Sequence, residues 1–344
     1  MPSRIAPRTL NLPTSMPKPT LRRPPTRASS SYTHPSLAGH HALITGGSRG
    51  IGKAIAARLS SLSAHTTIIG RNAPTLRSAL HEITAASPAS PSTPLQPAHG
   101  YVVGDISTKG FWEMLSRSLI LRHTLPASNP STSQRSGAGA EQDEEQAAQP
   151  HTFDPAPLTL LINAAGVTHN ALLVRQSPSA AEDVVQTNLM GTVWGCKVLG
   201  KALIGNAKQW RKQPSKGEGE LLKGGLSIVN VSSLLAVQGG VGSAAYAASK
   251  AGVLGLTRAL AGEMGPLGVR VNAIVPGYIE TDMTAAMQTA AREKALERIP
   301  LKRFGTVEEI ADAAVFLATN QYANNCVINL DGGMSAVSNQ SCPA

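Results

Sequence analysis

The amino-acid sequence predicts an α/β fold in a single domain, with a doubly wound parallel β-sheet and helices on both faces. Short β-branched apolar runs at 41–45, 66–70, 226–231 and 269–275 alternate with segments of helical pattern, which is the order expected for a parallel sheet. A glycine-rich turn, 46–52, joins the first run to a helical pattern. Ligands of such folds bind beyond the carboxyl ends of the strands, so the residues that follow each run are the candidates for a functional site.

The turn after the first predicted strand has the features of a phosphate-binding site. His41–Thr45 predicts the strand, and a helical pattern begins at Lys53. Glycines let the backbone approach a pyrophosphate closely, while the amino terminus of a helix offers unpaired N–H groups and the positive end of its dipole. Strand, turn and helix in this order predict a Rossmann-type dinucleotide site. Its candidate cofactor contacts are Gly46, Ser48, Arg49, Gly50, Ile51 and Gly52.

The residue after the second predicted strand indicates which dinucleotide binds. Sites for NAD place an acidic residue there to bind the ribose 2′-hydroxyl, whereas a basic residue accommodates a 2′-phosphate. The chain has Arg71 and no acid at this point, and Arg49 lies in the glycine turn. Because two separate positions agree, we expect NADP(H) as the cofactor. A solvated surface role for either arginine is the alternative.

The stretch around the strand 226–231 carries the catalytic candidates. Ser233 follows the strand, and an alanine-rich segment that favours helix places Tyr246 and Lys250 four residues apart on one face. A fixed cation beside a phenol favours the ionised form and lowers a pKa that is ordinarily about 10. We therefore expect Tyr246 to act as an acid or base, and Ser233 to hydrogen-bond the same substrate oxygen. An ordinary helix face would explain Tyr-x-x-x-Lys alone, so the prediction depends on all three residues.

These residues resemble the short-chain dehydrogenase/reductase family, whose active site uses a serine, a tyrosine and a lysine at this spacing. The glycine turn has the Thr-Gly-x-x-x-Gly-x-Gly form of that family, and the resemblance spans about residues 37 to 336. It implies a fourth catalytic residue, Asn188, in a helical stretch over 180–203, which would support a water near Lys250. A buried asparagine satisfied by backbone groups is the alternative for Asn188.

The resemblance also implies further cofactor contacts, each just beyond a predicted strand. Asp105 and Ile106 match the strand end that contacts the adenine, and Asn163-Ala-Ala-Gly166 is a version of the family's Asn-Asn-Ala-Gly. The turn after 269–275 matches the one beneath the nicotinamide. The complete implied set comprises Asp105, Ile106, Asn163, Ala164, Gly166, Pro276, Gly277, Ile279 and Thr281, together with Tyr246 and Lys250 at the nicotinamide ribose.

Two segments, 166–175 and 276–284, are similar to the substrate-side loops of the 3-oxoacyl-acyl-carrier-protein reductases of fatty acid biosynthesis. This resemblance implies NADPH-dependent reduction of a 3-oxoacyl thioester to the 3-hydroxyacyl thioester, and a homotetramer or a tetramer with a related subunit. Two alternatives stay open. One is a reductase or dehydrogenase of the same fold that acts on a polyketide, a small ketone or another carbonyl or alcohol; the other is a catalytically idle dinucleotide-binding partner subunit.

An acyl carrier protein is acidic, so a reductase that uses it should present basic side chains near the entrance of the site. The sequence offers candidates in the segment before the catalytic strand and near the helices. They are Lys212, Lys216, Lys223, Arg175 and Arg258.

Three stretches of different composition interrupt the predicted domain, 37–336. Residues 86–99 are rich in Pro, Ser and Ala, 126–157 add Gly, Gln and an acidic cluster, and 205–225 are dominated by Lys, Gly and Gln. None can bury much apolar surface, so we predict disordered insertions within loops and no domain boundary. Residues 337–344 are expected to form a tail.

The formal net charge of +10 is concentrated at the start of the sequence. Six basic residues precede residue 37, and no acidic residue occurs before Glu82. An Arg- and Ser-rich stretch without acids is typical of a mitochondrial presequence, so we predict that residues 1–36 are disordered and direct the protein to the mitochondrial matrix. A basic tail without an address, on a cytoplasmic protein, is the alternative. The remaining charge is spread along the chain and does not indicate a nucleic-acid partner.

The cysteines Cys196, Cys326 and Cys342 show neither metal-ligand spacing nor a disulfide framework. We therefore expect reduced thiols and no metal site. Since no apolar run approaches the length of about 18 residues that crosses a bilayer, we also expect a soluble protein without a membrane span.

Overall fold

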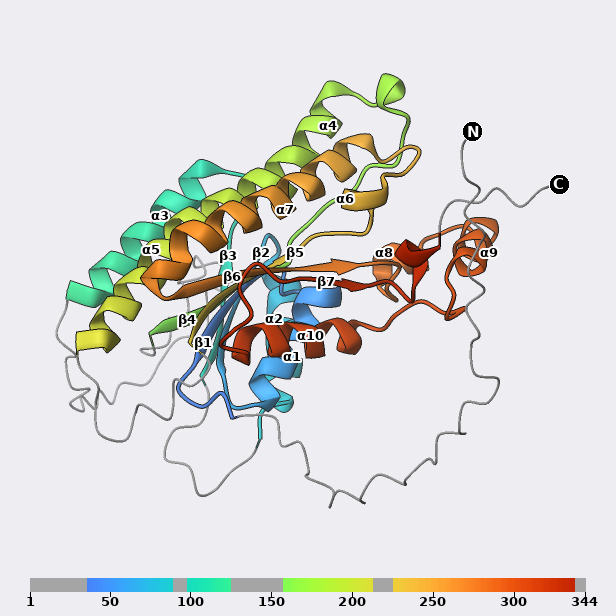
Figure 1. The fold of residues 1–344 in the computed structure, drawn as a ribbon. Helices are drawn as coiled ribbons and strands as arrows, with labels where there is room; N and C mark the ends of the chain where they lie inside the picture. Colours follow the sequence, from blue (N-terminus) through green and yellow to red (C-terminus); the bar gives the residue numbers. More distant parts are fainter. Residues whose placement is uncertain (1–35, 89–97, 125–156, 213–224, 338–344) are drawn as a thin grey trace, which may run out of the picture. The chain divides into compact units, whose positions relative to one another are not determined.

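The computed structural model describes residues 36–88, 98–124, 157–212 and 225–337. Within these residues the strands form one parallel, seven-stranded sheet in the order β3-β2-β1-β4-β5-β6-β7 (Figure 1). The predicted fold class is therefore confirmed. The strands are β1 (His41–Thr45), β2 (His65–Gly70), β3 (His99–Val103), β4 (Leu158–Asn163), β5 (Leu226–Val231), β6 (Val269–Pro276) and β7 (Val327–Leu330).

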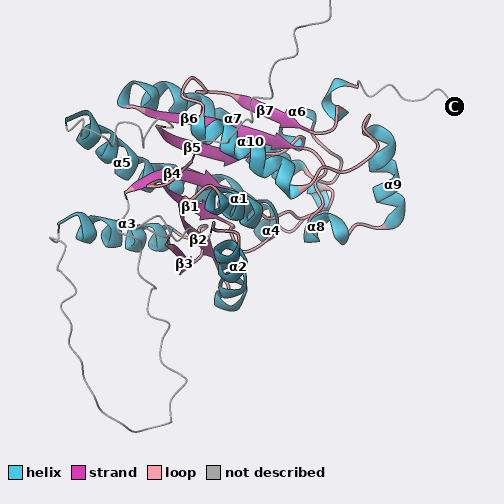
Figure 2. Ribbon diagram, turned by 90° about the horizontal axis from the view of Figure 1, so that it is seen from below, coloured by secondary structure: helices cyan, strands magenta, loops and turns pink. Residues whose placement is uncertain are grey.

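Long helices cover both faces of the sheet (Figures 1 and 2). On one face α1, α2 and α10 pack on a core that includes Ile55 and Val315, and on the other α3, α5 and α7 pack on a core that includes Trp112 and Leu199. These helices are α1 (Gly50–Ser61), α2 (Ala73–Ala85), α3 (Lys109–Thr124), α5 (Gly191–Lys212), α7 (Ala244–Met264) and α10 (Val307–Thr319). Apolar side chains thus fill both helix–sheet layers.

Shorter elements occupy the connections. They are α4 (Pro178–Val185), α6 (Leu235–Gln238), α8 (Asp282–Ala285) and α9 (Thr289–Arg298), a π-helical turn (Gln186–Met190), and the 3-10 turns Leu173–Arg175, Gly265–Leu267 and Met334–Ala336. Side chains cap several helix starts. The Thr306 hydroxyl accepts from the Glu309 N–H while the Glu309 carboxylate accepts from the Thr306 N–H, which forms a capping box at the start of α10.

The strand order places the functional site. From β1 the chain moves outward to β2 and β3, and then returns to β4 on the other side of β1. A crevice forms beyond the carboxyl ends of the strands at such a reversal, and ligands of open α/β sheets bind there. The loops after β1, β4, β5 and β6 carry most of the sequence-predicted site residues. All four loops begin at the carboxyl ends of the strands, at the edge of the sheet where this crevice lies.

Two predicted boundaries are corrected. The predicted helix 180–203 consists of α4, the π-helical turn and α5, and α5 continues to Lys212, so residues 205–212 are not part of an insertion. They stay helical because Ala207 is buried and the Asn206 side chain donates to the carbonyl of Leu158, 2.8 Å away, which fastens this end of the helix to β4. The strand β3 likewise begins at His99, within the predicted insertion 86–99.

The described part of the chain has three internal gaps, 89–97, 125–156 and 213–224. Each gap falls between a helix and the following strand, at β3, β4 and β5 respectively. The chain therefore re-enters the sheet at the amino ends of these strands, opposite to the carboxyl edge that carries the site residues. The rest of the predicted insertions, the leader 1–35 and the tail 338–344 lie outside the described residues.

Candidate active site and cofactor cleft

The glycine turn between β1 and α1 leaves no room for side chains at key positions. A Cβ at Gly52 would lie 2.3 Å from the carbonyl oxygen of Gly46, and one at Gly46 would lie 2.7 Å from Cα of Ala165. Gly46 and Gly50 also have φ of +70° and +52°, in the region that favours glycine. The turn is therefore a close-packed cradle at the amino terminus of α1, as a pyrophosphate site requires.

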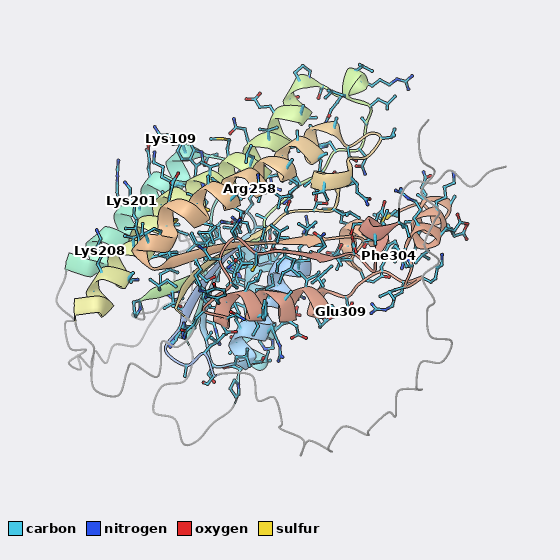
Figure 3. The ribbon with its side chains drawn as sticks, viewed as in Figure 1. Lys109, Lys201, Lys208, Arg258, Phe304 and Glu309 are labelled. Atoms are coloured by element: carbon cyan, nitrogen blue, oxygen red, sulfur yellow. The ribbon has the colours of Figure 1, made fainter. Side chains whose placement is uncertain are left out.

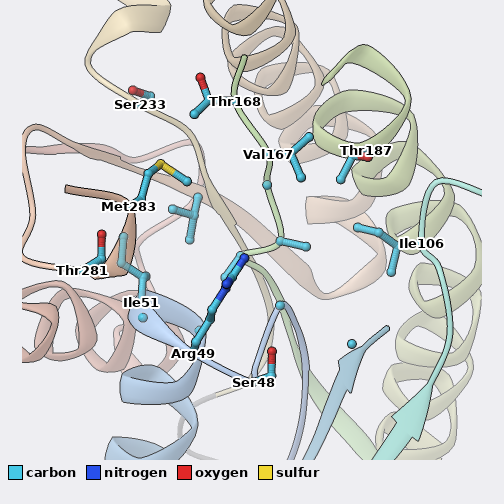
Figure 4. A pocket seen from close by; sticks show the side chains of 18 of the residues that line it. Ser48, Arg49, Ile51, Ile106, Val167, Thr168, Thr187, Ser233, Thr281 and Met283 are labelled. Carbon is cyan, nitrogen blue, oxygen red and sulfur yellow. The ribbon is translucent and has the colours of Figure 1, made fainter. Parts of the chain in front are cut away.

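One continuous cavity of about 670 Å³ extends from this cradle to the residues that follow β5 and β6 (Figure 4). Nearly all of the sequence-predicted site residues line it. They are Gly46, Ser48, Arg49, Gly50, Ile51, Gly52, Arg71, Asp105, Ile106, Ala164, Gly166, Ser233, Tyr246, Lys250, Pro276, Gly277, Ile279 and Thr281. The fold thus brings together residues that are up to 235 positions apart in the sequence.

Two predicted residues, Asn163 and Asn188, do not line the cavity. The Asn163 side chain points into the helix layer, where it donates to the amide oxygen of Asn230 at 2.9 Å and to the sulfur of Cys196 at 3.4 Å. It therefore joins β4 to β5 below the cleft. In the same loop, the N–H groups of Ala164 and Ala165 donate to the hydroxyl of Thr45, 3.2 and 3.3 Å away, which ties the loop after β4 to the end of β1.

Positive charge lines the cradle end of the cavity. The Arg49 side chain extends across the cavity in Figure 4, and Arg71 lines it just beyond β2. The neighbouring acid, Asp105, has one carboxylate oxygen that accepts from both the N–H and the hydroxyl of Ser107, at 2.9 and 2.8 Å. A helix amino terminus, a glycine cradle and two guanidinium groups fit the phosphates of NADP(H), including a 2′-phosphate beyond β2.

The candidate catalytic groups meet at the other end of the cavity. The Ser233 hydroxyl and the Tyr246 phenol lie close to each other in the cavity wall. The Lys250 ammonium lies 5.9 Å from the centre of the Tyr246 ring and donates to the carbonyl oxygen of Val231, 2.9 Å away. One turn of α7 thus places a phenol and an ammonium beside the serine that follows β5. This arrangement suits proton donation to a substrate oxygen.

The protonation equilibria differ from the sequence-based expectation. Burial raises the pKa of Tyr246 above its ordinary value of 10.0, and the hydrogen bond with Ser233 only partly opposes this. Burial also lowers the pKa of Lys250 to about 8. The expected lowering of the tyrosine pKa by the lysine is therefore wrong for this structure, because removal of the phenol from water outweighs the favourable interactions. Tyr246 is consequently held in its protonated form.

Asn188 lies in the π-helical turn between α4 and α5 and is fully buried. Its side-chain oxygen accepts from the N–H of Val167 at 2.8 Å, and its amide donates to the carbonyl of Val167 at 2.9 Å and to the hydroxyl of Ser249 at 3.1 Å. The side chain is thus occupied by protein groups, mostly backbone, as in the alternative interpretation of this residue. Since the Ser249 hydroxyl in turn donates to the carbonyl of Tyr246, Asn188 positions the catalytic helix.

Sequence reasoning missed several residues of the cavity wall. Thr168, His169 and Met283 line it, as do Asp183 and Thr187 from α4 and the π-helical turn (Figure 4 shows Thr168, Thr187 and Met283). The Asp183 carboxylate lies 3.4 Å from both the His169 ring and the Thr187 hydroxyl. Thr168, His169 and Met283 belong to the predicted substrate-side loops 166–175 and 276–284, whereas Asp183 and Thr187 follow no glycine turn or regular spacing that could mark them.

The described residues hold no group of His, Cys, Asp and Glu side chains that could bind a metal ion. Among them there is also no helix with the length and apolar character needed to cross a membrane.

Known proteins resemble this chain in sequence and in fold. Two family models match it, "short chain dehydrogenase" over residues 40–96 and "Enoyl-(Acyl carrier protein) reductase" over residues 214–335. The 3-oxoacyl-[acyl-carrier-protein] reductase of Chlamydia muridarum is 32% identical over 297 residues, which cover 86% of this chain and 96% of that protein. The reductase of the same name from Thermotoga maritima is 41% identical over 179 residues, 52% of this chain and 66% of the relative.

A similar solved structure is that of a putative 2-deoxy-d-gluconate 3-dehydrogenase from Agrobacterium tumefaciens with bound NADP. It has a TM-score of 0.65 and 31% sequence identity, and the match covers 88% of this chain and 98% of that one. These relatives share one fold and differ in the substrates that their names give. The chain therefore belongs to the short-chain dehydrogenase/reductase family and is an NADP-dependent oxidoreductase.

Proposed function

We propose that the protein reduces 3-oxoacyl thioesters, carried on acyl carrier protein, to 3-hydroxyacyl thioesters with NADPH, as a step of fatty acid biosynthesis. The observation that carries the proposal is the meeting of Ser233, Tyr246 and Lys250 at one end of a cavity whose other end is a phosphate cradle. The relatives named 3-oxoacyl-[acyl-carrier-protein] reductase support the choice of an acyl thioester as the substrate and of acyl carrier protein as its carrier.

The side chains divide the reaction between them. NADPH, when bound, supplies the hydride that reaches the 3-oxo carbon. The Ser233 hydroxyl orients the carbonyl oxygen, and Tyr246 transfers its phenolic proton to the alkoxide that forms there. The ammonium of Lys250 stabilises the phenolate that remains until a proton from solvent restores the phenol. Asn188 keeps this geometry by its bonds to Val167 and Ser249.

A carrier protein would dock near the entrance of the cleft, and the basic candidates there agree only in part with those that the sequence suggests. Lys212 ends the 22-residue helix α5, about 30 Å along the axis from the turn that holds Asn188. Lys216 and Lys223 lie outside the described residues. Exposed bases closer to the cleft are Arg175 and, in the first half of α5, Lys197 and Lys201. Figure 3 shows Lys201 on the helical layer that also bears Arg258. We propose these four residues as the docking bases.

The test is a comparison of substrates at two ionic strengths. We expect a higher kcat/KM for a 3-oxoacyl-carrier than for the matching pantetheine thioester, with a difference that shrinks as salt screens the attraction. Substitution of Lys201 by Glu should lower kcat/KM for the carrier-bound substrate and leave the pantetheine thioester unaffected. A clear preference for a free ketone or a sugar acid would assign the protein to the other substrates of its family, and the absence of turnover with any carbonyl would favour an idle partner subunit.

We also propose that two copies of the chain associate through the edge strand β7, and that two such pairs form a tetramer. In the described residues β7 pairs only with β6, and the apolar side chains of Val327 and, on α10, Phe316 are exposed beside it. Tyr322, between these elements, is 98% exposed. An open strand edge with apolar neighbours is a typical pairing surface. Light scattering of Val327→Glu should give a smaller particle than that of the unaltered protein.

A further inference from the structure

Helix α9 presents mostly polar residues, and within it only Ala295 is buried. One of its side chains makes two specific contacts outside the helix. The Arg292 guanidinium donates to the carboxylate of Glu280, and its central carbon lies 4.3 Å from the centre of the Phe304 ring. Arg292 thus joins α9 to two other segments at once.

The first of these segments forms part of the cofactor cleft. Glu280 stands between Ile279 and Thr281, which both line the cavity, whereas Glu280 does not. The carboxylate is therefore turned away from the cavity and toward α9. The position that Arg292 gives to Glu280 fixes the backbone of the two residues that face the cofactor. Beyond them α8 begins, with Met283 in the cavity wall.

The second segment, residues 303–305, forms a rigid base for the turn 279–281. The rings of Phe304 and Tyr278 are stacked, with centres 5.1 Å apart and planes 18° apart. The N–H of Gly305 donates to the carbonyl of Tyr278, and the N–H of Glu280 donates to the carbonyl of Gly305, both at 2.9 Å. A Cβ at Gly305 would lie 2.8 Å from Cδ1 of Ile279, so the two segments are in close contact.

This base is itself held at the start of α10. The Glu309 carboxylate accepts from the N–H of Thr306 and from the guanidinium of Arg303, at distances of 2.6 to 2.9 Å. Figure 3 shows Phe304 and Glu309 near this helix start. Residues 303–305 are thus fixed to the body of the fold, and Arg292 fastens α9 to them through the ring of Phe304.

We propose that Arg292 is a positioning residue for NADPH: it locks the turn Ile279–Thr281 in the conformation that binds the cofactor, by holding Glu280 and Phe304 together. The inference concerns the cofactor and stands whatever the carbonyl substrate is. A guanidinium can serve both contacts because its edge donates hydrogen bonds while its plane stacks on a ring. Loss of this lock should leave the turn formed but less ordered, which weakens cofactor binding.

The experiment is an equilibrium titration of the purified full-length protein with NADPH, followed by nucleotide fluorescence and without any carbonyl substrate. Arg292→Met keeps the apolar stem and removes the charge and the plane, and Glu280→Gln removes the other charge. We expect each to raise the Kd for NADPH about tenfold, equivalent to about 1.4 kcal/mol. The double variant should be little weaker than Arg292→Met alone, because Glu280→Gln breaks an ion pair that the loss of the arginine has already removed.

Two variants serve as controls. Arg292→Lys restores the ion pair without the plane and should recover part of the lost affinity. Lys294→Met removes a charge from the exposed face of the same helix, where Lys294 makes no ion pair in the described part of the chain, and should leave the Kd unchanged. Phe304→Leu tests the stacking contact alone and should raise the Kd by a smaller factor.

The proposal is overturned if Arg292→Met lowers the melting temperature while the Kd stays the same, since the residue would then be structural only. Additive losses in the double variant would overturn the paired action with Glu280. Because the titration uses no carbonyl compound, neither outcome depends on whether the protein reduces acyl thioesters, and a failure of that function in the substrate comparison would leave this result intact.

Discussion

Lys250 donates a hydrogen bond to the carbonyl oxygen of Val231, the last residue of β5, across 2.9 Å. A second bond joins the same two segments, because the hydroxyl of Ser232 donates to the backbone carbonyl of Lys250 at 2.8 Å. The catalytic helix α7 is thereby fastened to the strand that presents Ser233. The distance between the serine and the tyrosine is thus set by bonds that involve neither of their hydroxyls.

Replacement of Tyr246 by Phe should abolish most turnover while the cofactor still binds. The ring is kept, so the packing survives, but the proton that the substrate oxygen needs is lost. We expect kcat to fall by about two to four orders of magnitude. Steady-state assays give kcat, and a fluorescence titration gives the Kd for NADPH, which should remain within about threefold of the original. Turnover close to normal would place the proton donor elsewhere.

The kcat/KM for NADPH should decrease as the pH rises through about 8. Burial lowers the pKa of Lys250 to about 8 in the free protein, so above this pH the ammonium becomes a neutral amine and no longer stabilises the phenolate. The kcat/KM for a substrate reports the groups of the free enzyme, so this parameter should show the transition. Lys250→Arg keeps a positive charge at every pH, and its residual activity should lack the alkaline decrease. An unaltered pH profile in that variant would contradict the assignment.

Arg71→Ala should weaken NADPH much more than NADH. A charge-assisted hydrogen bond to the 2′-phosphate contributes about 1.5–3 kcal/mol, so the Kd for NADPH should rise by about 10- to 100-fold. The Kd for NADH should be nearly constant, because NADH has no phosphate at this position. The measurement is a pair of fluorescence titrations on the same preparation. Equal losses for both cofactors would show that Arg71 only shapes the cleft.

The free energy of unfolding should decrease in mild acid. The His99 ring lies between the hydroxyls of Thr66 and Ser60, and burial followed by the nearby charge of His65 lowers its pKa from 6.5 to about 4. Between these values the unfolded chain binds a proton that the folded chain does not, so stability is lost as the pH falls from about 6.5 to about 4. Urea titrations of His99→Gln should show a smaller slope with pH. A slope identical to that of the unaltered protein would assign the acid sensitivity to other groups.

The leader, residues 1–36, should direct a fused reporter protein into mitochondria, because an Arg- and Ser-rich stretch without acids is typical of import signals. We expect the imported leader to be cleaved near residues 28–32. Microscopy and mass spectrometry of the reporter check both expectations. Diffuse fluorescence with a full-length leader would support a cytoplasmic protein instead.

The parts of the site that sequence analysis predicted are those whose signals are local. The glycine turn before α1 and the four-residue spacing of Tyr246 and Lys250 are each contained in a short segment, and the structure brings them to one cavity. The contacts of Asn188 could not be predicted, because its partners Val167 and Ser249 lie 21 and 61 residues away. The direction of the Tyr246 pKa shift was predicted wrongly for a related reason: spacing shows which charge is near, whereas burial depends on the whole fold.

The three stretches outside the described residues each connect the end of a helix to the amino end of a strand, so their attachment points lie at the edge of the sheet opposite the cleft. Insertions and deletions in these connections can therefore accumulate in evolution without an effect on catalysis, because the catalytic residues lie at the opposite edge of the sheet. The same places are suited to laboratory use. An affinity tag, a fluorescent protein or a protease site inserted at 125–156 should leave the enzyme working, whereas an insertion of equal length between β5 and α7 would separate Ser233 from Tyr246.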